Sequence, residues 1–233
     1  MTDTTYPHAE LLASTSWLAE HLDEPQLKIL DARGEGEYAE GHVPGALLLP
    51  PGAFRATSGV ADVCSPEEFA ETAGALGISA DDPVVCYDAA GPAGARAWWA
   101  FARFGHRNVK FLNGGIRQWL SEERPLSTEA TSPEPMTYTL GAPVEDLVCS
   151  LPQAVSAVSE GAVLFWDVRS ADEFSGANPR SNPPDRAGHI PGAVQLEWNE
   201  LVNAETGLFK PAAEMERTLA AKGISPESEV VTY

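Results

Sequence analysis

Short apolar runs alternate along the chain with segments whose apolar residues recur at helical spacing. LKILDA (27–32), VVCYD (84–88) and VKFL (109–112) are apolar runs of strand length. ARAWWAFARFG (95–105) repeats apolar residues at helical spacing and ends at a glycine, which is typical of a helix and its C-cap. The pattern predicts an α/β fold in which a mostly parallel sheet carries helices on both faces.

The pattern occurs twice. LKILDARGEGEY (27–38) recurs as VLFWDVRSADEF (163–174), and GHVPGA (41–46) recurs as GHIPGA (188–193). ALGISADDPVVCY then recurs as AKGISPESEVVTY, in the same order. The second copy carries an insertion within SGANPRSNPPDRA (175–187), whose Gly, Asn and Pro content predicts a loop. Ordered matching over most of both halves indicates a duplication.

The duplication predicts two domains joined by a connector. The segment PLSTEATSPEPMTYTLGAP contains four prolines and no helical or strand period for most of its length, so we expect an extended strap. The predicted boundaries are 1–124 for the first domain, 125–143 for the connector and 144–233 for the second domain. The second copy stops at Tyr233, the equivalent of Tyr87, so we expect this domain to be incomplete here, truncated before the loop that Asp88 begins in the first copy. In parallel sheets that loop is where ligands bind.

Charge and cysteine content exclude several classes of function. The 233 residues include 15 Lys+Arg and 34 Asp+Glu, a formal charge of −19, so a nucleic-acid partner is not expected. No apolar stretch has the length of a membrane span and no secretory signal is visible, which favours a cytoplasmic protein without a membrane partner. Three widely spaced cysteines indicate neither a disulfide framework nor a zinc site. We predict no metal site and no cofactor.

Several motifs in order resemble the tandem-domain rhodanese family, the thiosulfate and 3-mercaptopyruvate sulfurtransferases. They are DARGEGEYAEGHVPGA (31–46), the long element from DVRSADEF to GHIPGA, ARAWWAFARFGHRNVKFLNGGIRQW (95–119) and the Pro-rich connector. The resemblance covers nearly the whole chain and implies two rhodanese-like domains. It implies that the first lacks a nucleophile, with Asp88 in its place. It also implies that the nucleophilic cysteine directly follows Tyr233, so that no catalytic residue lies within 1–233.

The implied chemistry is transfer of a sulfane sulfur. A cysteine thiolate takes sulfur from thiosulfate or 3-mercaptopyruvate, holds it as a persulfide, and passes it to a thiophilic acceptor such as cyanide or a thiol. Converging backbone N–H groups at a helix N-terminus lower the pKa of such a thiol and stabilise the anion. The sequence leaves the preferred donor, the physiological acceptor and the oligomeric state open.

The expected sulfur donors are anions, whereas the chain has a formal charge of −19. Binding such a donor therefore requires positively charged side chains close to the active site. Arg186, in the insertion of the second copy, is the best candidate for binding the substrate, and Arg180 is the alternative in the same insertion. A solvated loop arginine is the competing interpretation. The family often has a basic residue where this chain has Glu173. The family's substrate-binding pattern therefore cannot be transferred completely to this chain.

Four further residues are candidates for supporting the active site. Asp167 and Arg169 either orient the catalytic loop or brace the strand end, and recurrence of the pair in both copies favours a structural ion pair. Asp88 is interpreted as a replaced nucleophile that helps to shape a cleft between the domains. Trp198, after the GHIPGA turn of the second copy, is a candidate for lining that cleft.

Other conspicuous residues have structural interpretations. The histidines of the two GHxPGA turns are expected to be hydrogen-bonded, and Cys86 is expected to pack within its strand. Two other functions stay open: a non-catalytic rhodanese-like binding or regulatory module, and a phosphatase of the related type with a longer cysteine loop. The residue after Tyr233 and the length of its loop discriminate between them.

Overall fold

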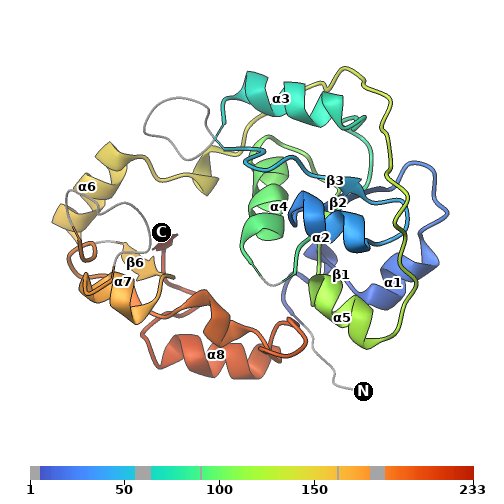
Figure 1. The fold of residues 1–233 in the computed structure, drawn as a ribbon. Coiled ribbons are helices and arrows are strands. Elements are labelled where there is room, and N and C mark those ends of the chain that lie inside the picture. The colour runs from blue at the N-terminus through green and yellow to red at the C-terminus, as the bar shows by residue number, and fades with distance from the viewer. Residues whose placement is uncertain (1–5, 56–63, 90, 162, 179–186) are drawn as a thin grey trace. The chain divides into compact units, whose positions relative to one another are not determined.

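The computed structural model describes residues 6–55, 64–89, 91–161, 163–178 and 187–233. These residues form two compact units (Figure 1). The N unit comprises Pro7–Leu147 together with Glu205–Leu208. The C unit comprises Val148–Ala204 and Phe209–Tyr233, and Tyr6 also belongs to it. None of the described helices has the length and apolar character needed to cross a membrane.

The N unit is built on a sheet of five parallel strands in the order β1-β5-β4-β2-β3. Its strands are β1 (Leu12–Ala13), β2 (Lys28–Asp31), β3 (Leu47–Leu48), β4 (Val84–Tyr87) and β5 (Val109–Leu112). Its helices are η1 (Ala9–Leu11), α1 (Thr15–Glu20), α2 (Glu35–Glu40), α3 (Pro66–Ala75), α4 (Ala93–Arg103), α5 (Gly115–Ser121) and η2 (Glu145–Leu147). The apolar runs of the sequence are therefore the buried strands of this sheet.

Helices cover both faces of this sheet, as predicted. Successive side chains of a strand point to opposite faces. In β4, Val84 and Cys86 pack into the core formed with α3 and α4, whereas Val85 and Tyr87 pack into the core formed with α1, α2 and α5. Each core is closed by apolar helix faces, so the four buried residues of β4 are covered on both sides of the sheet.

The connector lies along the N unit. Described residues 125–143 contain no helix or strand, and in Figure 1 the trace runs from the end of α5 past α3. The Met136 amide donates to the Gly74 carbonyl of α3 at 2.9 Å. A methyl group on Gly74 would lie 2.4 Å from the Met136 carbonyl oxygen, so this contact requires glycine. Tyr138 is buried against Phe69. The predicted strap is thus part of the packing of this unit.

The C unit repeats the central strands of the N unit. Its parallel sheet has the order β7-β6-β8, and β6 pairs Trp166 with Val194 and with Thr232. In the first copy the corresponding residue, Leu30, pairs with Leu47 and with Cys86. Its elements are α6 (Leu151–Glu160), β6 (Leu164–Asp167), α7 (Ala171–Ser175), β7 (Val194–Gln195), η3 (Trp198–Leu201), α8 (Ala212–Ala220) and β8 (Val230–Thr232). The shared register confirms the duplication.

Candidate functional site

A buried ion pair lies at the carboxyl end of β2 in the N unit. Arg33 Nε and Nη2 lie 2.9 Å and 2.5 Å from the two carboxylate oxygens of Asp31. The Tyr87 hydroxyl donates to the same carboxylate at 2.6 Å and accepts the Val43 amide at 3.2 Å. Arg33 Nη2 also donates to the Gly41 carbonyl. The network ties the ends of β2 and β4 to the GHVPGA turn, and it compensates a charge that would be costly to bury alone.

The C unit contains the same network. Arg169 Nε and Nη2 lie 2.9 Å and 2.5 Å from the Asp167 carboxylate oxygens, and Nη2 donates to the Gly188 carbonyl at 3.0 Å. The Tyr233 hydroxyl is hydrogen-bonded to Asp167 and accepts the Ile190 amide at 3.0 Å. Burial acts to raise the pKa of Asp167, but the hydrogen bonds from Arg169 outweigh it and hold that pKa below its usual value.

Asp167 and Arg169 therefore brace the ends of β6 and β8. This is one of the two roles expected from the sequence, and a part in catalysis stays a prediction. The sequence analysis missed the tyrosine of the network. This tyrosine could have been found from the sequence, because Tyr87 and Tyr233 end VVCY and VVTY at matching positions of the two copies.

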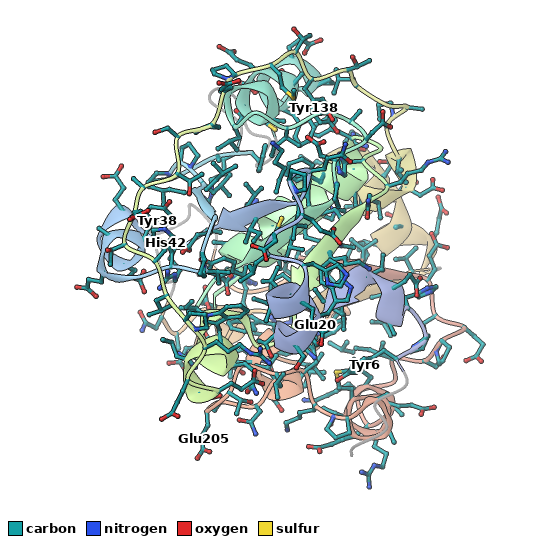
Figure 2. The ribbon with its side chains drawn as sticks, turned by 90° about the vertical axis from the view of Figure 1, so that its right-hand side faces the viewer. Tyr6, Glu20, Tyr38, His42, Tyr138 and Glu205 are labelled. Carbon is teal, nitrogen blue, oxygen red and sulfur yellow. The ribbon has the colours of Figure 1, made fainter. Side chains whose placement is uncertain are left out.

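The GHxPGA histidines are hydrogen-bonded, as expected. His42 is buried, stacks on Tyr38 with ring centroids 3.7 Å apart, and its Nδ1 lies 2.8 Å from the Tyr38 carbonyl oxygen (Figure 2). His189 stacks on Phe174 at 3.6 Å and has the same contact to the Phe174 carbonyl. These contacts hold each turn against the preceding helix.

Asp88 begins the loop between β4 and α4 and turns its side chain into that loop. Its carboxylate accepts the Gly94 amide at 2.8 Å and the Gly91 amide at 3.3 Å, and the Ala93 amide also donates to it. Only 5% of the residue is exposed. Burial raises the pKa of Asp88 to about 6 even though these N–H groups act to lower it. The loop is therefore a cradle for an anion, and in this copy the anion is a side chain of the chain itself.

The three cysteines lie away from such a cradle. Cys86 is fully buried between strands and helices, as expected, and burial raises the pKa of its thiol. Burial also raises the pKa of Cys64 to about 11. Cys149 is exposed, one residue before the N-cap of α6. The described residues contain no group of three or more His, Cys, Asp or Glu side chains placed to hold a metal ion.

Of the remaining candidate site residues, the structure describes some and not others. Arg180 and Arg186 lie outside the described residues. Trp198 begins η3, and its amide donates to the Val168 carbonyl next to the Asp167–Arg169 brace. Glu173, the departure from the family pattern, folds back to accept the Ser170 amide in the capping box of α7. This carboxylate stabilises a helix start.

The fold and the repeated network define a duplicated parallel α/β protein with a loop that cradles an anion at the end of its central strand. Residues 14–122 and 150–233 each match the rhodanese-like domain family, and the chain belongs to this family with two such domains in tandem.

Relatives over nearly the full chain are named as sulfur-handling proteins. The chain is 36% identical to the sulfur carrier protein TtuD of Thermus thermophilus, covering 98% of this chain and 83% of that protein. It is 33% identical to the thiosulfate sulfurtransferase of Corynebacterium glutamicum, covering 98% and 78%. It is 31% identical to the 3-mercaptopyruvate sulfurtransferase of Rattus norvegicus, covering 94% and 80%. The chain therefore falls in the sulfurtransferase group of the family.

Solved structures agree on the fold. The crystal structure of SseA from Escherichia coli, described with the 3-mercaptopyruvate sulfotransferases, has a TM-score of 0.82 at 29% identity, covering 95% of this chain and 87% of that one. The wild-type structure of EanB also has a TM-score of 0.82, at 20% identity, and the match spans 59% of its length. This second likeness concerns the fold alone.

Proposed function

We propose that this protein transfers a sulfane sulfur from thiosulfate or 3-mercaptopyruvate to a thiophilic acceptor through a cysteine persulfide in its second domain. The nucleophile is a cysteine directly after Tyr233. The observation that carries the proposal is the equivalence of Tyr87 and Tyr233, whose hydroxyls have the same hydrogen-bond partners in the two copies. In the first copy the next residue enters a cradle of N–H groups that holds an anion.

Such a cradle supplies what a persulfide enzyme needs. Backbone N–H groups that hold a carboxylate in the first copy would hold a thiolate, and later a persulfide anion, at the same position in the second copy. They lower the pKa of a thiol because they stabilise its charged form. No general base is required, since the thiolate is already the reactive species.

The reaction balances without an external oxidant or reductant. The thiolate attacks the outer sulfur of thiosulfate, a sulfur–sulfur bond forms, and sulfite leaves with the electron pair of the broken bond. The acceptor, cyanide for example, then attacks the terminal sulfur of the persulfide. Thiocyanate is released and the thiolate is restored, as in thiol–disulfide exchange.

The test is peptide mapping by mass spectrometry of the full-length protein before and after incubation with thiosulfate. We expect one added sulfur atom on the peptide that begins beyond Tyr233, and complete loss of this sulfur after cyanide. The matched controls are Cys64→Ala, Cys86→Ala and Cys149→Ser, which we expect to take up sulfur as the unmodified protein does. Sulfur on one of these three cysteines would contradict the proposed site. No uptake from thiosulfate or 3-mercaptopyruvate would favour the non-catalytic binding module.

The substrate side of the proposal concerns the insertion of the second copy. We expect Arg186 to bind the anionic donor, with Arg180 as the alternative, because a guanidinium group binds carboxylates and oxyanions by paired hydrogen bonds. Arg186→Gln should raise KM for thiosulfate about tenfold or more, the effect of losing one charged hydrogen bond. Arg217→Gln, on exposed α8, is the matched control with an unchanged KM. Equal KM values in Arg186→Gln, Arg180→Gln and the control would remove both arginines from the substrate site.

We also propose that the protein is located in the cytoplasm. Cell fractionation with an antibody against the full-length protein tests it, and enrichment in a membrane or exported fraction would contradict it.

A further inference from the structure

A single buried side chain anchors the connector in the N unit. Every residue of 125–143 is described, and Tyr138 is the only one of them that is buried (Figure 2). Its ring packs at nearly a right angle on Phe69 of α3, with ring centroids 5.2 Å apart. The apolar packing of the connector therefore depends on Tyr138.

Backbone hydrogen bonds hold the connector to the helices on both sides of Tyr138. Before it, the Met136 amide donates to the Gly74 carbonyl of α3 at 2.9 Å. After it, the Val144 amide donates to the Arg103 carbonyl of α4 at 2.8 Å. These two amides are protected from solvent exchange only while this part of the chain lies on the N unit.

The hydroxyl group of Tyr138 is hydrogen-bonded to His106, a buried residue that follows α4. His106 Nδ1 lies 2.9 Å from this hydroxyl, and Nε2 lies 2.9 Å from the Asp82 carbonyl oxygen. A carbonyl only accepts, so in the neutral ring Nε2 carries the hydrogen and Nδ1 is the acceptor. Burial raises the pKa of Tyr138 to about 12, so its hydroxyl keeps the proton that it donates to Nδ1. One neutral form of His106 therefore satisfies both contacts.

A second proton on His106 disrupts this arrangement. Nδ1 then becomes a donor, so the Tyr138 hydroxyl must accept from it, and the hydrogen of that hydroxyl needs another acceptor. Within the described part of the chain, this hydroxyl has no hydrogen-bond partner other than His106. A buried donor without a partner and a buried charge both cost free energy. Both costs disappear when Tyr138 leaves the core and water reaches the two groups.

The groups around His106 set the direction in which its pKa moves. The carboxylates of Asp81 and Asp82, in the loop before β4, act to raise this pKa, as do the backbone contacts of the ring with Asp82 and Asn108. On the α4 side the ring packs on Phe101, which is apolar. Burial outweighs the carboxylates, so the pKa of His106 lies below its ordinary value of 6.5.

From these observations we propose that the contact between His106 and Tyr138 is a pH-sensitive switch, which releases residues 132–143 of the connector from the N unit in acid. The released form uncovers Phe69, on which Tyr138 packs at neutral pH. A lowered histidine pKa stabilises the closed form fully above the ordinary value of 6.5, and this contribution is lost as pH falls through the folded pKa. The proposal does not depend on sulfur transfer, because only the opening of the connector is measured.

The experiment is hydrogen exchange of the full-length protein between about pH 5.5 and about pH 7.5, followed by mass spectrometry. Each rate is divided by that of the unstructured chain at the same pH, which gives the equilibrium constant of opening. For peptides that contain Met136 and Val144, we expect this constant to rise as pH falls, by about tenfold per pH unit at most, the slope of one proton. Peptides from β4 should show no such rise, because the strand stays in the sheet.

Two variants test whether His106 and Tyr138 are responsible. His106→Asn has no ionisable ring, so its connector peptides should lose the rise in acid. His8→Asn is the matched control, because the His8 side chain is 75% exposed, and it should keep the rise. Tyr138→Phe keeps the ring in the core but removes the hydroxyl that donates to Nδ1. NMR of the imidazole rings should then show His106 titrating at a higher pH than in the unmodified protein, a shift that a merely structural tyrosine would not cause.

Four results would overturn the proposal. The opening constant of the connector peptides could be the same across the pH range, or it could rise equally in His106→Asn and His8→Asn. The β4 peptides could open in parallel with the connector, which would indicate unfolding of the whole N unit. The titration midpoint of His106 could also stay unchanged in Tyr138→Phe.

Discussion

Replacing Asp31 by alanine is expected to lower the free energy of unfolding of the N unit by about 3–5 kcal/mol, the cost of leaving a buried charge without its partner. Asp31 is fully buried and only 7% of the Arg33 side chain is exposed. The variant leaves this guanidinium group buried without its carboxylate partner. It also removes the acceptor of the Tyr87 hydroxyl. Hydrogen exchange of peptides from β2 and β4, followed by mass spectrometry, measures the local stability.

The C unit provides the matched control. In Asp167→Ala the arginine that loses its carboxylate partner is Arg169, whose side chain is 35% exposed. Solvent compensates much of the lost interaction, so we expect a cost of about 1–2 kcal/mol, read from β6 and β8 peptides. Equal losses in the two variants would contradict the argument, because burial of the arginine is the main difference between the two networks.

The second prediction with a large effect concerns pH and Asp88. Burial raises the pKa of Asp88 to about 6 in the folded protein, from an ordinary value of 3.8. A raised carboxyl pKa stabilises the fold fully below the ordinary value, and this contribution is lost as pH rises through the folded pKa. We expect the N unit to lose about 3 kcal/mol from this group between the acid limit and neutral pH.

Asp88→Asn isolates the effect of Asp88 from that of other carboxyl groups. The asparagine does not ionise, so the variant should gain stability relative to the unmodified protein as pH rises. Urea unfolding between about pH 5 and about pH 7.5, away from the pI, covers the second half of the change. Tryptophan fluorescence reports mainly on the N unit, which contains Trp17, Trp98, Trp99 and Trp119. A constant stability difference between the two proteins would show that Asp88 does not titrate in this range.

Much of the fold could be predicted because its signals are local. The predicted strand 109–112 is β5 as observed, and the runs at 27–32 and 84–88 contain β2 and β4. Continuous apolar runs of this length are stable only when both faces are covered, so they also indicated helices on both sides. The duplication could be predicted because corresponding residues keep the same order in both copies.

The candidate site was less accessible to sequence reasoning. Asp31 and Arg33 stand two residues apart, so the ion pair could be anticipated, but its tyrosine partner is 56 residues away from Asp31. Which neighbours a strand acquires is settled by the sheet order, and β2 lies beside β4 only in the folded sheet. Asp88 was anticipated as a replaced nucleophile that helps to shape a cleft. That its carboxylate occupies the loop amides depends on the path of the loop.

The sequence by itself therefore determined the duplication, the central strands, the two histidine turns and the excess of negative charge. These features depend on composition or on residues that are close together along the chain. The tertiary structure alone decided which carboxylate meets which N–H group and how the connector packs on α3. These features join segments that are distant along the chain. Their energies come from burial and hydrogen bonding that exist only once the sheet has brought those segments together.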